Sequence, residues 1–308
     1  MIIKNYVYGP VPSRRLGLSL GLNIIPKKTC TLNCIYCQCG RTTNLTLARR
    51  SFYPIDEILK EVRTAVAEHR IDYLTFSGEG EPTLNKDIGK LIRLLKAEFK
   101  IPVAVITNST LLFDPKVRHD LYRADLVVPS LDAADQKTFH RINRSHPDLK
   151  VEKIVQGLKT FRRYYKGKLW LEIMLVKGVN DSPEHLMKLR RLAYEIKPDR
   201  VHLNTVVRPP AEKDALPLTM DDLNQVKLLF GPEAEIAFSP IKTRQRKFHG
   251  NSQKAVLAVV ENRPVTEEDL CRSLGIPTRD IKPVLEELVK QGLIKKVAFW
   301  GKTFYESR

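Results

Sequence analysis

Apolar, β-branched segments alternate with amphipathic segments over residues 18–241, and this alternation constrains the fold more than any other feature. The candidate strands are SLGLNII, DYLTFSG, VAVITN, ADLVVPSL, LWLEIMLV, RVHLNTVV and EIAFSP. The candidate helices between them include IDEILKEVRTAVAEH, DIGKLIRLLKAEF, VEKIVQGLKTFRRYY and SPEHLMKLRRLAYEI. Continuous apolar strands separated by helices of this length predict an α/β fold with a parallel sheet covered by helices. Six or seven such units favour a partial (β/α)6 TIM-like barrel over an open flat sheet.

The pattern changes after Pro240. Residues 242–252 are polar and basic and are expected to form a linker. Residues 253–308 have the pattern of three helices followed by a two-stranded ribbon, which is the outline of a winged helix-turn-helix. The sequence therefore predicts a barrel over residues 1–241, the linker, and a small C-terminal domain.

Specific residues set the expected element ends in that small domain. Thr266 is expected to cap the second helix, with Asp269 three residues later as in a capping box. Thr278 is expected to cap the third helix. Gly292 should end that helix, and Gly301 lies where the ribbon needs a hairpin turn.

Composition excludes several protein classes. A chain of 308 residues that is 43% hydrophobic can bury a large core, so disorder is not expected. No stretch approaches the roughly 18 apolar residues of a membrane span, and the first residues lack a secretory signal pattern. We therefore expect a cytoplasmic protein without a membrane anchor. Five cysteines do not make a disulfide framework, and a tight group of thiols in a reducing compartment indicates metal or redox chemistry.

Four of the five cysteines lie in the segment TCTLNCIYCQCG, residues 29–40. Cys30, Cys34 and Cys37 follow the first strand of the alternating region, at the strand end where a parallel barrel carries its chemistry. Three thiolates can hold three irons of a 4Fe-4S cluster and leave the fourth open. A structural zinc site usually needs four ligands, and no matching second pair follows. The spacing thus favours a cluster with an open iron over zinc or unliganded thiols.

The stretch Cys30-Thr-Leu-Asn-Cys34-Ile-Tyr36-Cys37 resembles the signature of the radical S-adenosylmethionine (radical SAM) enzymes, and the resemblance extends over roughly residues 9–241. The segment TFSGEGEPTL, residues 75–84, is similar to the glycine-glycine-glutamate element of that family. The resemblance implies that Tyr36 contacts the cofactor, that two glycines let the backbone approach it, and that a glutamate or its adjacent backbone receives the methionine ammonium. The last three positions are Gly78, Gly80 and Glu81. Such a segment could otherwise be an ordinary turn at a strand end.

Further polar residues follow later strands and resemble family contacts to the ribose and carboxylate of the cofactor. They are Thr107, Asn108, Ser130 and Asp132. Asn and Asp are also common where strands turn into helices, so the structural interpretation stays open for these positions. Glu172 and Asn204 lie on the next two strands and could either reach the site or serve as buried structural residues.

The resemblance also implies a reaction. S-adenosyl-L-methionine would chelate the open iron through its amine and carboxylate, and an electron from the reduced cluster would release a 5'-deoxyadenosyl radical that abstracts hydrogen from a substrate. An external donor such as flavodoxin or ferredoxin would supply the electron. Because the cofactor carries the chemistry, no protein acid or base is required and no catalytic residue is assigned.

Two cysteines lie outside the triplet. Cys39 is interpreted as a neighbouring thiol without a ligand role, with a substrate-contacting or redox role as the alternative, and Cys271 is interpreted as core packing. The two cannot build an auxiliary cluster, which disfavours the subgroups that need one.

The net charge of +17 suggests an anionic partner such as nucleic acid. Residues 251–308 carry ten basic and eight acidic side chains, so most of the excess lies in the rest of the chain. The expected third helix of the small domain has balanced charge, which favours protein docking over DNA reading by that domain. Basic residues flanking the cysteine loop and later strand ends could line the mouth of the site or merely solubilise the protein. They are Arg14, Arg15, Lys27, Lys28, Arg41, Arg49, Arg50, Arg141, Arg144 and Arg208.

The N-terminal stretch GPVPSRRLGLSLG resembles a radical SAM group related to the tRNA wyosine-base synthases. Those enzymes carry upstream cysteines, whereas this chain has no cysteine before Cys30, so their specific reaction is not carried over. Three hypotheses remain: an enzyme acting on RNA or another phosphate-bearing substrate, an enzyme that modifies a protein or peptide or activates a glycyl-radical partner, and a DNA-binding iron-sulfur sensor. The cofactor motifs on several strands argue against the sensor.

Overall fold

The computed structural model describes residues 6–13, 15–237, 252–261 and 263–307. Its centre is an eight-stranded sheet with the strand order β1-β2-β5-β6-β7-β8-β9-β10. The strands are β1 (Val7–Ser13), β2 (Gly17–Leu22), β5 (Tyr73–Phe76), β6 (Val103–Thr107), β7 (Leu126–Pro129), β8 (Lys168–Leu175), β9 (Arg200–Thr205) and β10 (Ala234–Ile236). All neighbours from β2 to β10 pair in parallel, whereas β1 pairs antiparallel with β2. The expected α/β fold with a mostly parallel sheet is confirmed.

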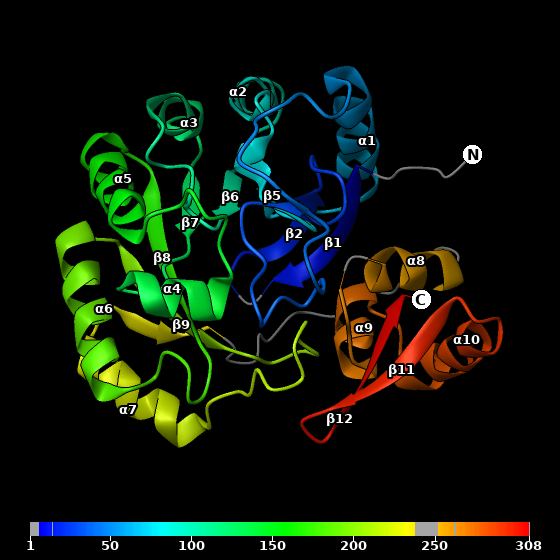
Figure 1. Cartoon of the computed structure of the whole chain (residues 1–308). Coiled ribbons are helices and arrows are strands. Elements are labelled where there is room, and N and C mark those ends of the chain that lie inside the picture. Colours follow the sequence, from blue (N-terminus) through cyan, green and yellow to red (C-terminus); the bar gives the residue numbers. More distant parts are fainter. Residues whose placement is uncertain (1–5, 14, 238–251, 262, 308) are drawn as a thin grey trace.

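Helices follow the outer face of the sheet in an arc (Figure 1). They are α1 (Ile55–Glu68), α2 (Ile88–Glu98), α3 (Pro115–Leu121), α5 (Val151–Tyr164), α6 (Pro183–Ile196) and α7 (Met220–Phe230). The short helix α4 (Gln136–Asn143) lies inside this arc (Figure 1). Because successive residues of a strand point to opposite faces, β6 divides its side chains between two apolar clusters. Val103 and Val105 join the large core with the helices, and Ala104 joins a smaller cluster with Val128 and Trp170. The second cluster marks the inner face of the curved sheet.

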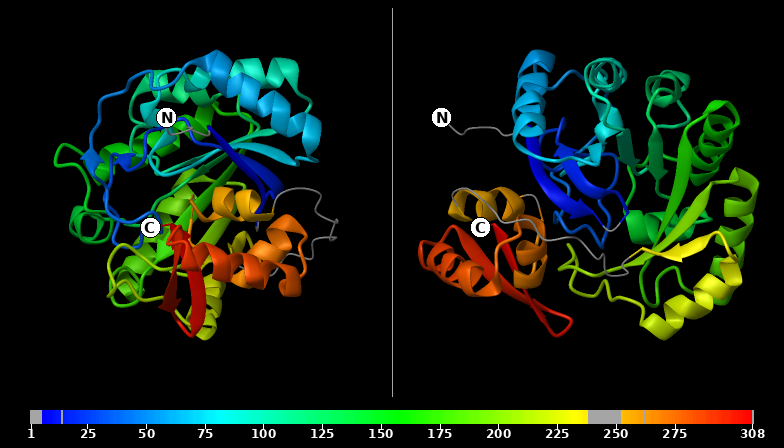
Figure 2. Two further views of the ribbon diagram at one scale, coloured as in Figure 1. Left: turned by 90° about the vertical axis from the view of Figure 1, so that its right-hand side faces the viewer. Right: turned by 180° about the vertical axis from the view of Figure 1, so that it is seen from behind.

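The sheet is open between its two edge strands, since β1 and β10 stand at opposite ends of the strand order among the described residues. This arrangement is consistent with the expected partial barrel, and Figure 2 shows the curvature from two further sides. No helix in the described part of the chain has both the length and the apolar character needed to span a membrane.

Several elements were not predicted from the sequence. Strand β1 contains a glycine and two prolines, and its register with β2 is irregular between Tyr8 and Val11. Proline is tolerated on edge strands and at bulges, which explains how this segment can be a strand despite its composition. The helices α3, α4 and α7, the 3-10 helix η1 (Pro82–Leu84) and the short pair β3 (Thr29–Cys30) and β4 (Asn44–Leu45) were also missed. The predicted strand EIAFSP corresponds to β10, and its residues after 237 lie outside the described residues.

The C-terminal module, by which we mean the described residues from 252 to 307, has the predicted order of elements. It contains α8 (Ser252–Val260), α9 (Glu267–Leu274), α10 (Thr278–Lys290), β11 (Ile294–Phe299) and β12 (Lys302–Ser307). The last two strands pair antiparallel. The predicted linker 242–252 lies outside the described residues except for Ser252, which already belongs to α8.

The predicted element ends in the module can be checked individually. Thr266 caps α9 in a reciprocal capping box with Asp269, as predicted. The predicted cap at Thr278 is wrong: the extended residue before the helix is Pro277, so the threonine already lies in the first turn of α10. Gly301 has a φ of +70° in the two-residue turn that joins β11 to β12, which confirms the predicted hairpin.

The module packs against the edge strand β1. Val11 of β1 is 6% exposed and shares an apolar cluster with Val256, Leu270 and Ile281 of the module. Figure 1 shows the module beside β1 and near the loop that follows β9. The module therefore lies at the open side of the sheet.

Candidate functional site

The cysteine loop, residues 29–40, leaves the sheet after β2 and lies over the carboxyl ends of the parallel strands. Two tight turns shape it, because the amide of Cys37 donates to the carbonyl of Cys34 at 3.2 Å and the amide of Gly40 donates to the carbonyl of Cys37 at 3.0 Å. The loop packs closely on the segment after β5. A Cβ atom on Gly80 would lie 2.1 Å from the carbonyl oxygen of Thr29.

The packing around Gly78 and Gly80 explains why the chain has glycine at these two predicted cofactor positions. Gly80 admits the backbone of the cysteine loop, and a Cβ atom on Gly78 would lie 2.4 Å from the Asn23 side-chain oxygen. Protein atoms already occupy the space beside both positions. A larger residue at either position would push the cysteine loop or Asn23 away.

The carboxylate of Glu81 joins the ends of β5 and β6. It is 2% exposed and accepts hydrogen bonds from the amide and hydroxyl of Thr83, at 3.0 and 2.5 Å. It also accepts from the Thr107 hydroxyl at 2.6 Å and from the Asn108 amide at 2.7 Å. Four donors thus surround this carboxylate. Burial raises the pKa of Glu81, and these hydrogen bonds oppose the rise.

Asn108 connects the end of β6 to the cysteine loop. Its amide nitrogen donates to the Cys30 sulfur at 3.5 Å and to the Thr31 hydroxyl at 2.8 Å. Its amide oxygen accepts from the backbone and hydroxyl of Thr110. The side chain is therefore fixed in the orientation that directs an N–H group at Cys30.

Asp132 forms a second connection, 4% exposed at the end of β7. Its carboxylate accepts from the Tyr36 hydroxyl at 2.5 Å, from the Asn143 amide at 2.8 Å and from the Met174 amide at 3.0 Å. Burial raises the pKa of Asp132, and the hydrogen bonds oppose this change. The structure thus brings together two predicted site residues, Tyr36 and Asp132, that lie far apart in the sequence.

Asn143 was not predicted. It lies at the end of α4, is 2% exposed, and donates to the Cys34 sulfur at 3.3 Å as well as to Asp132. The sequence carries no clear signal for it, because α4 itself was not predicted. Ser130, by contrast, was predicted, and its carbonyl accepts from the Ser109 hydroxyl.

The thiols of the loop differ in their electrostatics. Burial raises the pKa of Cys30 to about 12 and that of Cys34 well above the usual range. Hydrogen bonds from Cys39 and the charge of Lys28 outweigh burial and lower the pKa of Cys37 to about 6. Negative charge on Cys30 and Cys37 also raises the pKa of Cys34, so the three sulfurs lie within electrostatic reach of one another.

This donor set fits an iron-sulfur cluster better than a single ion. Among the described residues, no three Cys, His, Asp or Glu side chains converge on one metal position. In a 4Fe-4S cluster each cysteine binds a different iron, so the sulfurs need not converge. Two of the three thiols also receive side-chain amide N–H groups, the donors that tune cluster sulfurs in proteins.

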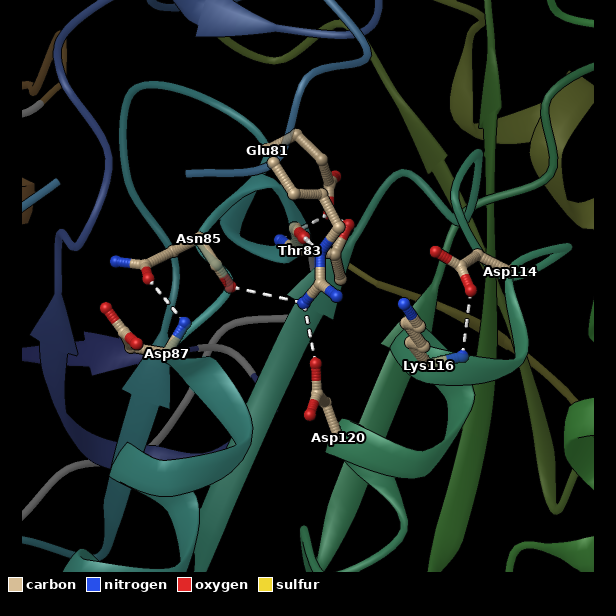
Figure 3. Close-up of polar contacts among 8 residues, drawn as sticks. Glu81, Thr83, Asn85, Asp87, Asp114, Lys116 and Asp120 are labelled. Carbon is tan, nitrogen blue, oxygen red and sulfur yellow. Dashed lines mark hydrogen bonds and ion pairs between the residues drawn. The ribbon is translucent and has the colours of Figure 1, made fainter. Parts of the chain in front are cut away.

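Many of the predicted basic residues of the mouth are used in structural ion pairs. Arg49 pairs with Asp120 at 2.6 Å and donates to the carbonyls of Thr83 and Asn85 (Figure 3). The other pairs are Arg41 and Arg144 with Glu212, Lys27 with Glu79, Arg208 with Asp269, and Arg15 with Glu172. Arg141 donates to the carbonyl of Gly178, and Arg14 lies outside the described residues. These side chains tie loops together.

Glu172 and Asn204 face the inner side of the barrel. Glu172 pairs with Arg15, which reaches inward from the segment between β1 and β2. Asn204 stands opposite Met174 in the β8–β9 register and lines a cavity. Glu172 therefore forms a half-buried structural ion pair, and Asn204 borders this cavity.

Comparison with known proteins gives a family and a fold. The model of the radical SAM superfamily matches residues 24–190. A UPF0026 protein of Methanocaldococcus jannaschii is 36% identical over 97% of this chain and 94% of its own length. A protein named GTPase Obg from Brachyspira hyodysenteriae is 39% identical over 94% of this chain, but the chain spans only 43% of that protein. A dual-specificity RNA methyltransferase RlmN of Nitratidesulfovibrio vulgaris is 29% identical over 60% of this chain and 52% of its own length.

Two solved structures share the fold at low sequence identity. A radical SAM methyltransferase from Sphaerobacter thermophilus has a TM-score of 0.53 at 19% identity, covering 71% of this chain and 66% of its own. SuiB of Streptococcus suis bound to S-adenosylmethionine has a TM-score of 0.51 at 20% identity, covering 66% of this chain and 45% of its own.

Proposed function

Because the chain belongs to the radical SAM superfamily, we propose that it reductively cleaves S-adenosylmethionine at a 4Fe-4S cluster bound by Cys30, Cys34 and Cys37. The cluster and S-adenosylmethionine are the cofactors of this superfamily, and together they supply a 5'-deoxyadenosyl radical for hydrogen abstraction from a substrate. The observation that carries the proposal is the donor set: three thiols in one loop over the strand ends, two of them receiving amide N–H groups from Asn108 and Asn143.

The protein residues act by holding and orienting. Asn108 and Asn143 would stabilise the thiolates of Cys30 and Cys34 by N–H donation, which favours the charged form that binds iron. Asp132 orients both Asn143 and Tyr36, so it sets the position of the loop without touching iron. Ser130, next to it, would contact the ribose or carboxylate of the cofactor.

Glu81 has a positioning role in this proposal. Its carboxylate already accepts four hydrogen bonds, so we assign recognition of the methionine ammonium to the backbone beside it. Gly80 lets that backbone lie close to the cysteine loop, and Gly78 makes room for the Asn23 side chain. The carboxylate fixes the two strand ends on which the cofactor would rest.

The electron would come from an external donor such as flavodoxin or ferredoxin. We place the enzyme in the cytoplasm, where reducing conditions keep thiols available for iron. Residues 253–308 would form a winged helix-turn-helix domain attached to a barrel of residues 1–241, and an apolar cluster made mostly of module residues, with Val11 of β1 at its edge, supports this division.

We infer that the substrate is RNA. The net charge of +17 and the similarity to an RNA methyltransferase over 60% of the chain support this inference. A protein or peptide substrate, including a glycyl-radical partner, is the second candidate. It is favoured by the charge balance of α10, where Arg279, Lys282 and Lys290 are offset by Asp280, Glu286 and Glu287.

The proposal can be tested by anaerobic reconstitution with iron and sulfide. The wild type should bind about four irons per chain, and its reduced spectrum should change when S-adenosylmethionine is added. Dithionite should then yield 5'-deoxyadenosine. Replacing Cys34 by alanine should abolish the spectral change with S-adenosylmethionine and the formation of 5'-deoxyadenosine. The matched change Cys39→Ala should keep the cluster. Zinc binding in place of iron, or a cluster spectrum that ignores S-adenosylmethionine, would contradict the proposal.

A further inference from the structure

A cavity of about 700 Å³ lies between the barrel and the C-terminal module. Both parts of the chain contribute to its walls. From the barrel come Arg15, Asn204 and Arg208, and from the module come Arg263, Trp300 and Lys302. We call this space the seam cavity. It exists only because the module packs on β1 at the open side of the sheet.

The barrel wall of the seam cavity lies next to the proposed cofactor site. Asn204 stands opposite Met174 in the β8–β9 register, and the Met174 amide donates to Asp132. Arg15 forms an ion pair with Glu172, and the backbone of Glu172 pairs with that of Ser130 in an isolated β-bridge. One strand therefore separates the cavity wall from two predicted cofactor contacts, Ser130 and Asp132.

A second cavity, of about 740 Å³, extends along the same seam toward the cysteine loop. It shares Arg263 and Phe299 with the seam cavity and is also lined by Gln38 and Cys39. The two spaces together follow the boundary between barrel and module from Asn204 to Cys39 at the end of the cysteine loop. A chain-like substrate could lie along this path.

The charges of the seam cavity favour an anionic occupant. Five cationic side chains line it, against the two carboxylates of Glu268 and Asp269. Those carboxylates pair with Arg272 and Arg208. Among the described residues, Arg263 and Lys302 form no ion pair, and the Arg263 Nε atom is buried without a hydrogen-bond partner. Within the described part of the chain, these two positive charges therefore line the cavity without an ion-pair partner.

An exposed aromatic ring stands beside these cations. Trp300 lies in the turn between β11 and β12 and is 58% exposed. Its backbone φ of +48° is a left-handed conformation that this two-residue turn requires and that tryptophan rarely adopts, so the turn alone would favour asparagine or glycine at this position. Aromatic rings next to cations are the usual means of binding a single strand, with bases stacked on the rings and phosphates on the cations.

We propose that the seam cavity binds a single-stranded segment of nucleic acid, with a base stacked on Trp300 and phosphates on Arg263 and Lys302. The module then acts through its hairpin and through Arg263 in the segment between α8 and α9, and the charge-balanced α10 takes no part. As a statement about substrate class this inference rests on the proposed function, but the binding itself requires no radical chemistry.

The test measures binding of a labelled 12-nucleotide RNA, and of DNA of the same sequence, by fluorescence anisotropy with the reconstituted, unreduced enzyme. The wild type should bind a single strand more tightly than the matching duplex. Trp300→Asn should weaken binding about 5- to 150-fold, the range of one base stacked on an aromatic ring. Asparagine suits a left-handed position before Gly301, so this change preserves the turn, and Trp300→Tyr should restore most of the affinity.

The charge contacts have their own measurement. The double change Arg263→Gln with Lys302→Gln should weaken binding and reduce the slope of log affinity against log salt by about 1.4, because two phosphate contacts on a single strand are lost. The matched control is Arg279→Gln with Lys282→Gln on α10, which should change neither quantity. The thermal unfolding midpoint of each variant checks that it folds.

The outcomes separate this inference from the proposed function. Loss of binding only in the α10 control, unchanged binding in both seam variants, or absence of single-strand binding by the wild type would overturn the inference. Tighter binding of RNA than of DNA, or the reverse, supports it and identifies the strand. The formation of 5'-deoxyadenosine from S-adenosylmethionine without nucleic acid is assayed in parallel, and its absence would count against the proposed function alone.

Discussion

Replacing His202 by phenylalanine should flatten the pH dependence of stability. His202 lies on the inner face of β9, is 2% exposed, and packs edge-on against Trp170 with ring centroids 5.2 Å apart. Its Nδ1 atom has no hydrogen-bond partner among the described residues. Burial, followed by the positive charges of Arg15 and Arg200, lowers the pKa of His202 to about 3.

The magnitude follows from proton linkage. An unfolded histidine has a pKa of about 6.5, so the unfolded chain takes up a proton below that pH while folded His202 stays neutral until about pH 3. The unfolded state then binds more protons, and the free energy of unfolding falls as the pH falls. Between pH 7 and pH 5 this one residue should remove about 2 kcal/mol. Glu235 lies 3.8 Å from Nε2, which is beyond hydrogen-bond distance, and it also pairs with Arg200. Burial and the two arginines therefore determine the direction of the pKa shift of His202.

The assay is urea unfolding of the cluster-free protein at pH 7 and pH 5. Wild type should lose about 2 kcal/mol more than His202→Phe over this interval, because the phenylalanine does not titrate. His69→Phe is the control, since the His69 side chain is 44% exposed, and it should keep the wild-type pH dependence. Equal losses in wild type and His202→Phe would refute the reasoning and indicate that His202 is protonated inside the barrel.

Three further predictions concern single contacts. Glu81→Ala should lower the free energy of unfolding by about 3 to 5 kcal/mol, because buried donors from Thr83, Thr107 and Asn108 lose their acceptor. Urea unfolding measures this change, and a loss below about 1 kcal/mol would contradict the prediction. Thr266→Ala should lower the free energy of unfolding by about 1 kcal/mol through loss of the α9 cap, whereas Thr278→Ala should lower it less because Thr278 caps no helix. Thermal unfolding compares the two variants, and a larger loss in Thr278→Ala would be inconsistent with the structure. Asn143→Ala should weaken iron retention about 10- to 100-fold, measured as iron release to a chelator, and a wild-type rate would show that the contact with Cys34 does not support the cluster.

Much of the fold was predictable because its signals are local. The alternation of apolar strands and amphipathic helices follows from the periodicities of the two structures, so seven sheet strands and four long helices were identified from the sequence. The same holds for the capping box at Thr266 and the hairpin at Gly301, which depend on neighbouring residues. Three of the misses have weak local signals: β1 carries two prolines, and α3 and α4 are only 7 and 8 residues long. The helix α7 is different, because its 11 residues and its capping box at Thr219 are a local signal that was overlooked.

By itself the sequence determined which chemistry this protein can carry: the spacing of Cys30, Cys34 and Cys37 places three thiols in one loop, and no distant contact is needed for that. Only the tertiary structure decided how the loop is held and what lies beside it. Asp132 meets Tyr36 across 96 positions, Asn143 reaches Cys34 across 109, and Trp300 faces the barrel because the module packs on β1. Such pairings depend on how helices and strands pack, and packing is set by buried surface over the whole chain rather than by residues near in sequence.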